Sequence, residues 1–188
     1  GFLTTLHPWL NYQNLLDGPS ISYATPGQIH DYYALGRSSI GTLIPKTTSA
    51  ISASCKVLPH LEGKFTSISF RIPTAIVSCG DVSVKFKKKV TTQTIKDILK
   101  ESQLNQKFKI LHNNEEPLIS ADFTGIDYSV VVDHRWTLVN EENYVKLVLW
   151  YDNEWGYSAR VKDLSAYLGE KIVQSKQEAS TQKEAILT

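Results

Sequence analysis

The run YVKLVLWY, at residues 144–151, constrains the fold more than any other part of the sequence. Its apolar and β-branched residues are typical of a buried strand in the middle of a sheet. The polar stretch DNEWG follows, and then YSARVKDLSAYLGEKI, in which Val161, Leu164 and Leu168 recur at the spacing of an amphipathic helix. The sequence therefore predicts a central strand that leads through a short polar connector into a helix over 157–172.

The other elements are expected in an irregular order along the chain. Alternating apolar residues predict strands, and apolar stripes behind threonine caps predict helices. Because helices and strands do not alternate regularly, the order favours the α+β class, with a mixed, largely antiparallel sheet and helices packed on one face, over a doubly wound sheet. The expected strands are 2–7, 65–72, 76–86, 107–111, 117–120 and 127–133, and the expected helices are 47–61 and 91–103.

Length and patterning predict a single domain over 1–173, followed by a polar tail over 174–188 that frays. Residues 8–37 form a long aromatic excursion without periodicity, which is unusual inside a compact domain and is typical of a functional or disordered segment. No G-x-G-x-x-G follows a strand, so a dinucleotide-binding domain is expected to be absent from this chain. The lack of Met, even at position 1, predicts a piece of a longer polypeptide.

Charge and cysteine content exclude several classes of protein. The formal net charge is +1, and the basic run KFKKKV at 85–90 is most simply a solvated strand face, so no nucleic-acid partner is expected. No stretch of 18 apolar residues occurs, so no membrane partner is expected either. Cys55 and Cys79 are too few for a disulfide framework or a zinc site, which predicts a cytoplasmic setting and no metal.

Three positions carry side chains suited to chemistry. His7 ends a strand, where it is either a hydrogen-bonded structural histidine or a base that titrates in the useful range. Arg71, in FRIPT, is explained either by an ion pair or by recognition of an anion. The hydroxyls of PKTTS at 45–49, including that of Thr48, either cap a helix or bind phosphate at its N-terminus.

A set of motifs in one order gives these positions a common meaning. Together they resemble the catalytic, C-terminal domain of phosphorylating glyceraldehyde-3-phosphate dehydrogenases, with the similar erythrose-4-phosphate dehydrogenases as an alternative. The resemblance covers nearly the whole chain, and WYDNEWGYS is its most specific part. The motifs are TTLH (4–7), LIPKTTSA (43–50), KVLPHLEGK (56–64), FRIPT (70–74), VSCGDVSV (77–84), SADF (120–123) and KLVLWYDNEWGYSARVKDL (146–164).

The resemblance implies a role for each matched residue and an oxidation of a sugar-phosphate aldehyde to an acyl phosphate through a cysteine thioester. It also implies NAD or NADP as cofactor, in combination with the absent N-terminal domain, and inorganic phosphate as second substrate. Residues 8–37 correspond to the loop that packs near the cofactor of a neighbouring subunit, and a homo-oligomer through the sheet face is implied. The matched residues are His7 as general base, Arg71, Thr48 and Ser49 as phosphate-binding residues, and Asn153 with neighbouring Tyr157 as cofactor-binding residues.

The sequence also departs from the pattern of this family. The nucleophilic cysteine of the family lies upstream of TTLH, in a Ser-Cys-Thr-Thr-Asn motif that this chain lacks. Leu10 and Tyr12 replace a threonine and an aspartate of the substrate-phosphate site, and the loop over 8–37 is longer than usual. The chain alone is therefore expected to be inactive.

Two other functions stay open on the sequence. One is a non-enzymatic module that keeps the dehydrogenase fold for oligomerisation or partner binding, which Leu10 and Tyr12 favour. The other is a cysteine hydrolase that pairs Cys55 or Cys79 with His7, although both cysteines occupy positions with a buried pattern.

Overall fold

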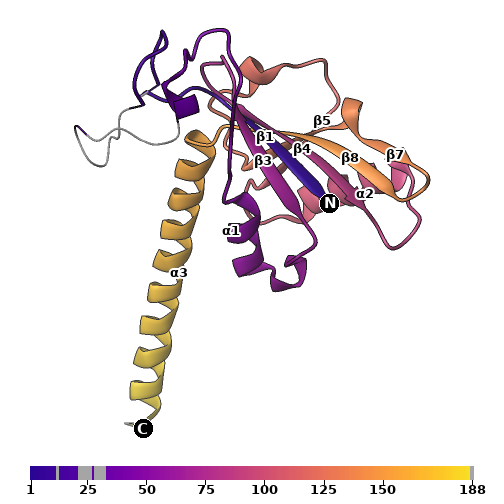
Figure 1. Cartoon of the computed structure of the whole chain (residues 1–188). Coiled ribbons are helices and arrows are strands. Elements are labelled where there is room, and N and C mark those ends of the chain that lie inside the picture. Colours follow the sequence, from indigo (N-terminus) through magenta and orange to yellow (C-terminus); the bar gives the residue numbers. More distant parts are fainter. Residues whose placement is uncertain (12, 21–26, 28–32, 187–188) are drawn as a thin grey trace.

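The computed structural model describes residues 1–11, 13–20, 27 and 33–186, and these residues form one sheet with helices beside it (Figure 1). Tyr12 and residues 21–26 and 28–32 of the expected excursion lie outside the described residues. The strands are β1 (Phe2–His7), β2 (Ile44–Lys46), β3 (Thr66–Arg71), β4 (Ser78–Lys85), β5 (Leu111–Asn114), β6 (Val130–Asp133), β7 (Leu138–Asn140) and β8 (Tyr144–Tyr151).

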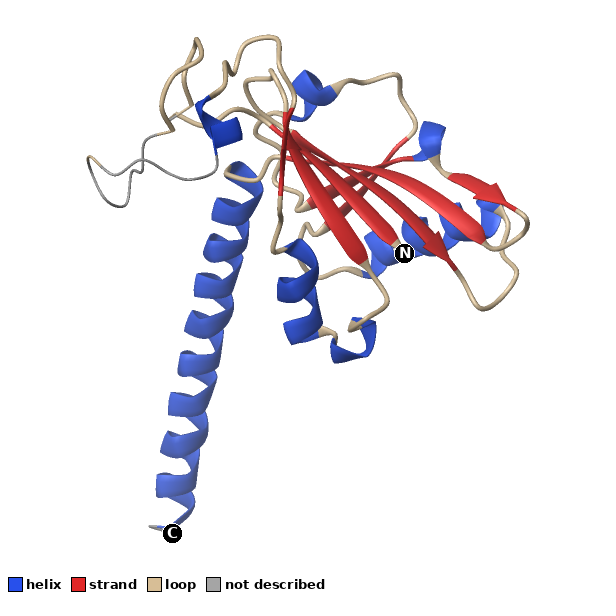
Figure 2. Ribbon diagram, viewed as in Figure 1, coloured by secondary structure: helices blue, strands red, loops and turns tan. Residues whose placement is uncertain are grey.

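The sheet has the order β2-β3-β1-β4-β8-β6-β5, and β7 pairs with β8 outside this path. Two pairs, β1–β3 and β5–β6, are parallel, and the others are antiparallel. This confirms the expected α+β class with a mixed, largely antiparallel sheet (Figure 2). The apolar run over 144–151 is β8, and it lies between β4 and β6 as a central strand.

Two expected strands are placed differently, because side chains compete for the backbone there. The Gln106 Oε1 atom accepts hydrogen bonds from the backbone N–H groups of Ile110 and Leu111, so strand pairing begins only at Leu111. Around 117–120 there is no strand, because the Asp122 carboxylate accepts from the Ile119 N–H and closes a 3-10 turn at Ser120–Phe123.

The helices are α1 (Ala50–Val57), α2 (Thr92–Asn105) and α3 (Trp155–Ile186). α1 is shorter than expected, because a 3-10 turn at Pro59–Leu61 follows it, and its N-cap is Ser49 rather than a threonine. α2 has the expected threonine cap, since the Thr91 side chain accepts a hydrogen bond from the Thr94 N–H.

α3 continues where we expected a frayed tail, and it runs away from the sheet (Figure 1). The tail sequence QSKQEASTQKEA contains mostly good helix formers, which explains its helical backbone. The apolar stripe of α3 is nevertheless largely exposed: Leu164, Leu168 and Ile172 each keep more than half of their surface open.

One buried cluster holds the centre of the sheet against the segment after β5. Val77, Phe123 and Val131 are buried together, and the rings of Phe123 and Trp150 stack with centroids 6.0 Å apart. Below them the fully buried Asp133 carboxylate accepts hydrogen bonds from Trp150 Nε1 and from the Arg135 side chain, which lower its pKa although burial alone would raise it.

Candidate functional site

The parallel pairing of β1 with β3 brings His7 and Arg71 together, because these last residues of the two strands are in register. Residues paired across neighbouring strands point to the same face, so both side chains lie on one face at one end of the sheet. Arg71 Nη1 donates a 3.0 Å hydrogen bond to the carbonyl oxygen of Pro8. Lys46, on β2, approaches the same pair closely enough for its charge to act on His7.

A bridge of hydrogen bonds joins His7 to the connector after β8. The Ser78 hydroxyl donates to Asn153 Oδ1 over 2.9 Å and lies 3.0 Å from His7 Nδ1. Because the single hydroxyl hydrogen of Ser78 is directed at Asn153, its oxygen accepts from the Nδ1–H of His7. This fixes the tautomer in which Nε2 is unprotonated and can act as a base, with the Tyr151 hydroxyl 3.4 Å away.

The electrostatics of this end of the sheet keep His7 neutral at pH 7. The pKa of His7 is lowered to about 4, first by burial and then by the positive charges of Arg71 and Lys46. The Tyr151 hydroxyl stays protonated, because burial raises its pKa to about 12. A neutral imidazole can accept a proton, and its basicity changes with the net charge of the groups beside it.

Asn153 is held in place by its buried neighbour Asp152. The Asp152 carboxylate accepts from the backbone N–H groups of Glu154 and Trp155, and so caps the start of α3. Its other oxygen accepts from the Gly125 N–H over 3.0 Å, which ties the cap to the segment before β6. The polar connector predicted from DNEWG thus has two functions, a helix cap at Asp152 and a site residue at Asn153.

The backbone before Ser78 is strained. Val77 has φ of 69°, a left-handed conformation that is unfavourable for a β-branched residue, and its side chain is buried in the core. The core therefore stabilises a conformation that directs Ser78 towards His7.

A small cleft of about 50 Å³ lies beside Arg71 and Asn153. Apolar side chains, among them that of Leu10, share its wall with the polar side chains of Arg71, Asn153 and Glu154. The lining residues are Pro8, Trp9, Leu10, Arg71, Ala75, Ile76, Asn153 and Glu154.

Other residues expected at the site are placed less centrally. The Thr48 hydroxyl accepts a hydrogen bond from the Ala50 N–H at the start of α1, two residues along the chain. Ser49 is the N-cap of α1 but makes no side-chain cap bond. Tyr157, on the first turn of α3, is 71% exposed and does not line the cleft.

Cys79 is not suited to act with His7. Cys79 pairs with Leu6 across β1 and β4, so its side chain points to the face opposite to that of His7. Burial raises the pKa of Cys79 to about 11, with a further contribution from Asp81, so the thiol stays protonated at neutral pH. This geometry disfavours a hydrolase that uses Cys79.

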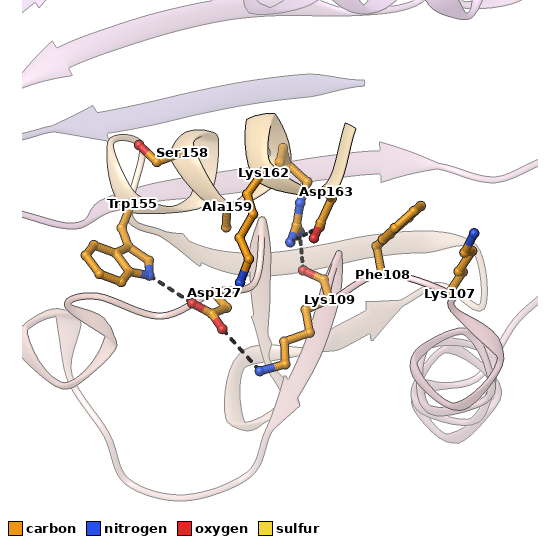
Figure 3. A pocket seen from close by; sticks show the side chains of 10 residues that line it. Lys107, Phe108, Lys109, Asp127, Trp155, Ser158, Ala159, Lys162 and Asp163 are labelled. Carbon is orange, nitrogen blue, oxygen red and sulfur yellow. Dashed lines mark hydrogen bonds and ion pairs between the residues drawn. The ribbon is translucent and has the colours of Figure 1, made fainter. Parts of the chain in front are cut away.

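A groove of about 410 Å³ has a lining that does not include His7 (Figure 3). It runs along the first turns of α3 and collects several cations. Two of them are paired within the groove: Lys109 with Asp127 over 3.1 Å, and Arg160 with Asp163 over 2.7 Å. Trp155 Nε1 also donates a 2.9 Å hydrogen bond to Asp127, so this carboxylate is shared by Lys109 and Trp155.

The sequence analysis missed Ser78, Tyr151 and Lys46. Ser78 and Tyr151 are in register on β4 and β8, but only the pairing of distant strands reveals that they meet His7. Lys46 precedes the two threonines of PKTTS. Nothing in the sequence distinguishes it from an ordinary basic residue near a helix cap.

The described helices do not combine the length and apolar character needed to cross a membrane. Among the described residues, no group of three or more His, Cys, Asp or Glu side chains is arranged to hold a metal ion.

Comparison with known proteins gives a consistent result. Residues 1–153 match the family described as "Glyceraldehyde 3-phosphate dehydrogenase, C-terminal domain". The chain is 40% identical over 168 residues to a cytosolic glyceraldehyde-3-phosphate dehydrogenase of Antirrhinum majus, which covers 89% of this chain and 47% of the relative. It is 39% identical over 171 residues to the glyceraldehyde-3-phosphate dehydrogenase of Omphalotus olearius, covering 91% and 48%. The chain spans about half the length of the curated relatives it matches.

Proposed function

Because the chain belongs to the glyceraldehyde-3-phosphate dehydrogenase family, as its C-terminal domain, we propose that it is the catalytic part of an NAD(P)-dependent phosphorylating aldehyde dehydrogenase. The enzyme oxidises a sugar-phosphate aldehyde to an acyl phosphate through a cysteine thioester. The observation that carries this proposal is the hydrogen-bonded bridge from His7 through Ser78 to Asn153, beside Arg71.

The bridge supports His7 as the general base. A thiol from outside this chain gives its proton to the unprotonated Nε2 of His7, and its sulfur adds to the aldehyde carbon. Loss of a hydride from that carbon, for which the bound nicotinamide would be the acceptor, and loss of the hydroxyl proton would leave the thioester. Arg71 binds the phosphate charge through its planar guanidinium, with Thr48 and Ser49 supplying hydroxyls at the start of α1. Inorganic phosphate then attacks the thioester carbon, the carbon–sulfur bond breaks, and the acyl phosphate leaves.

Asn153 is suited to the nicotinamide. Its Oδ1 atom is occupied by Ser78, which leaves the side-chain N–H groups to donate to the carboxamide of the ring, with Tyr157 nearby in sequence. The bound nicotinamide supplies the hydride acceptor of the reaction. The residues of this chain orient the ring and hold the proton, and most of the cofactor pocket belongs to the N-terminal domain.

The dinucleotide-binding domain and the nucleophilic cysteine are proposed to come from a polypeptide segment outside these 188 residues. The coverage of only about half of each relative supports this division, with a catalytic domain over 1–173 and a tail over 174–188. The chain alone is then inactive. A cytoplasmic location is proposed because several relatives are named cytosolic.

One face of the sheet supports a homo-oligomer. Register places Phe2, Ile68, Leu138 and Tyr144 on the face opposite to that of His7, and all four are strongly exposed. Exposed apolar side chains grouped on one sheet face are typical of a subunit interface.

A second candidate is a non-enzymatic module for oligomerisation or partner binding. Leu10 favours it, because this apolar side chain lines the cleft beside Arg71 and offers no hydrogen bond to a phosphate.

Reconstitution separates the two functions. We expect the chain alone to give no turnover of glyceraldehyde 3-phosphate with NAD or NADP and phosphate. Joined to the N-terminal half of the Antirrhinum majus relative, it should form acyl phosphate, and His7→Gln should then lower kcat by about 10²–10⁴-fold. His60→Gln, on an exposed turn, is the control and should leave kcat unchanged. A joined protein that folds and binds NAD but forms no acyl phosphate would favour the non-enzymatic module.

A further inference from the structure

Lys46 lies in an unusual place for a lysine. It pairs with Ser69, and Ser69 pairs with Thr5, so these three side chains form a row across β2, β3 and β1. The row is on the same face as His7 and Arg71, which lie two residues further along β1 and β3. Thr5 and Ser69 are buried, and Lys46 is half-buried beside them.

No acidic side chain balances the charge of Lys46 within the described part of the chain, since none of the ion pairs found there includes it. Burial and the charge of Arg71 both lower the pKa of Lys46. Two partly buried cations that repel each other cost stability unless an anion lies between them. In natural proteins, neighbouring buried charges of the same sign occur most often at functional sites.

One buried hydroxyl of this row lacks a partner in the part of the chain that the structure describes. Thr5 Oγ1 is buried and has no hydrogen-bond partner among the described residues. Buried hydroxyls of this kind are rare, because leaving one unpaired costs free energy. Leu10 lines the cleft beside Arg71 and offers no side-chain donor to an anion.

We propose that Lys46 is a second cationic residue, with Arg71, for binding a dianionic tetrahedral oxyanion at this end of the sheet. The inference rests on the proposed function and specifies its anion site. Two cations favour a dianion over a monoanion, and Lys46, unlike a hydroxyl, supplies a full charge. The dianion is either inorganic phosphate or the phosphate group of an ester, since both present the same oxygens.

The site then couples anion binding to the base. His7 is faced by Lys46 from β2, by Arg71 from β3, by Ser78 from β4 and by Tyr151 from β8, so its charged neighbours are both cations. A bound dianion offsets these cations and makes the imidazole a stronger base. The base is therefore strengthened only when the anion is present.

The test measures binding by the 188-residue chain, by calorimetry at pH 8 and low ionic strength, with inorganic phosphate and glycerol phosphate as separate probes. We expect Lys46→Met to weaken binding of at least one probe about tenfold or more. Lys56→Met, which removes the same charge from the exposed face of α1, should change binding less than about twofold. The probe that responds identifies whether the free anion or the ester is bound.

Three further results decide the proposal. An imidazole NMR titration should show the pKa of His7 rise when phosphate is added to the wild type, and rise less in Lys46→Met. If Arg71→Met abolishes binding while Lys46→Met matches the wild type, the role of Lys46 is overturned and the anion site of the proposed function stands. If the wild-type chain binds neither probe, the inference fails, while acyl-phosphate formation by the joined protein still decides the proposed function. A melting curve for each variant confirms that it is folded.

Discussion

At the residue scale, the site depends on one hydroxyl. Ser78 is fully buried, and it connects the imidazole of His7 with the side chain of Asn153, residues that the chain separates widely. The strained backbone of Val77 and its buried side chain hold Ser78 in this position. The imidazole of His7 is kept neutral because burial, and then the charges of Arg71 and Lys46, lower its pKa.

The low pKa of His7 predicts a loss of stability in acid. Between pH 6.5 and about 4 the unfolded chain binds a proton at this residue that the folded chain does not, so the free energy of unfolding falls as the pH falls. His7→Gln should flatten this fall by about 1 kcal/mol, after allowance for solvent screening at a half-buried site. Urea unfolding at pH 7.5 and 4.5 in phosphate-free buffer measures it, with His60→Gln as control. An equal slope in wild type and His7→Gln would contradict a depressed pKa.

At the element scale, the sequence predicted best where the apolar pattern alone decides the structure. β8 and β1 were predicted residue for residue, because their alternation matches a strand and nothing polar nearby competes with it. The strand expected at 107–111 was misplaced, since the Gln106 side chain satisfies the backbone there. Individual site residues such as His7 followed from motifs, but their contacts with Ser78 did not, because strand register is not encoded in any short stretch.

The cap of α3 leads to a test of the connector. Asp152→Ala removes the acceptor for the N–H groups of Glu154 and Trp155 and leaves the Gly125 N–H unpaired. We expect the free energy of unfolding to fall by about 1–2 kcal/mol. Glu154→Ala, at the exposed neighbour, should change it by less than about 0.5 kcal/mol. Equal effects of the two substitutions in denaturant unfolding would show that the cap does not stabilise the connector.

At the scale of the whole molecule, two apolar surfaces stand out. One is the sheet face with Phe2 and Leu138, and the other is the exposed apolar stripe of α3 with Leu164. The helix α3 itself runs away from the sheet (Figure 1). Their chemistry is similar, but the first is a broad, rigid surface and the second is a single helix. The proposed homo-oligomer uses the sheet face.

Matched lysine substitutions distinguish these surfaces. Leu138 and Leu164 are similarly exposed, at 52% and 57%, so either substitution should leave the fold intact. Leu138→Lys should weaken self-association at least about tenfold, because it places a charge in the interface, whereas Leu164→Lys should leave it unchanged. Sedimentation equilibrium over a range of protein concentrations gives the association constants. The opposite pattern would assign the contact to α3.

The central place of β1 has a kinetic consequence. This first strand finds its neighbours only after β3 and β4 have been synthesised, and His7 meets Ser78 across 71 residues and Tyr151 across 144. Contacts of such long sequence separation form late and slow the folding reaction. An emerging chain therefore carries no partly built imidazole site that could bind phosphate or accept protons prematurely. The environment of His7 is therefore complete only when β1, β4 and β8 have all paired in the sheet.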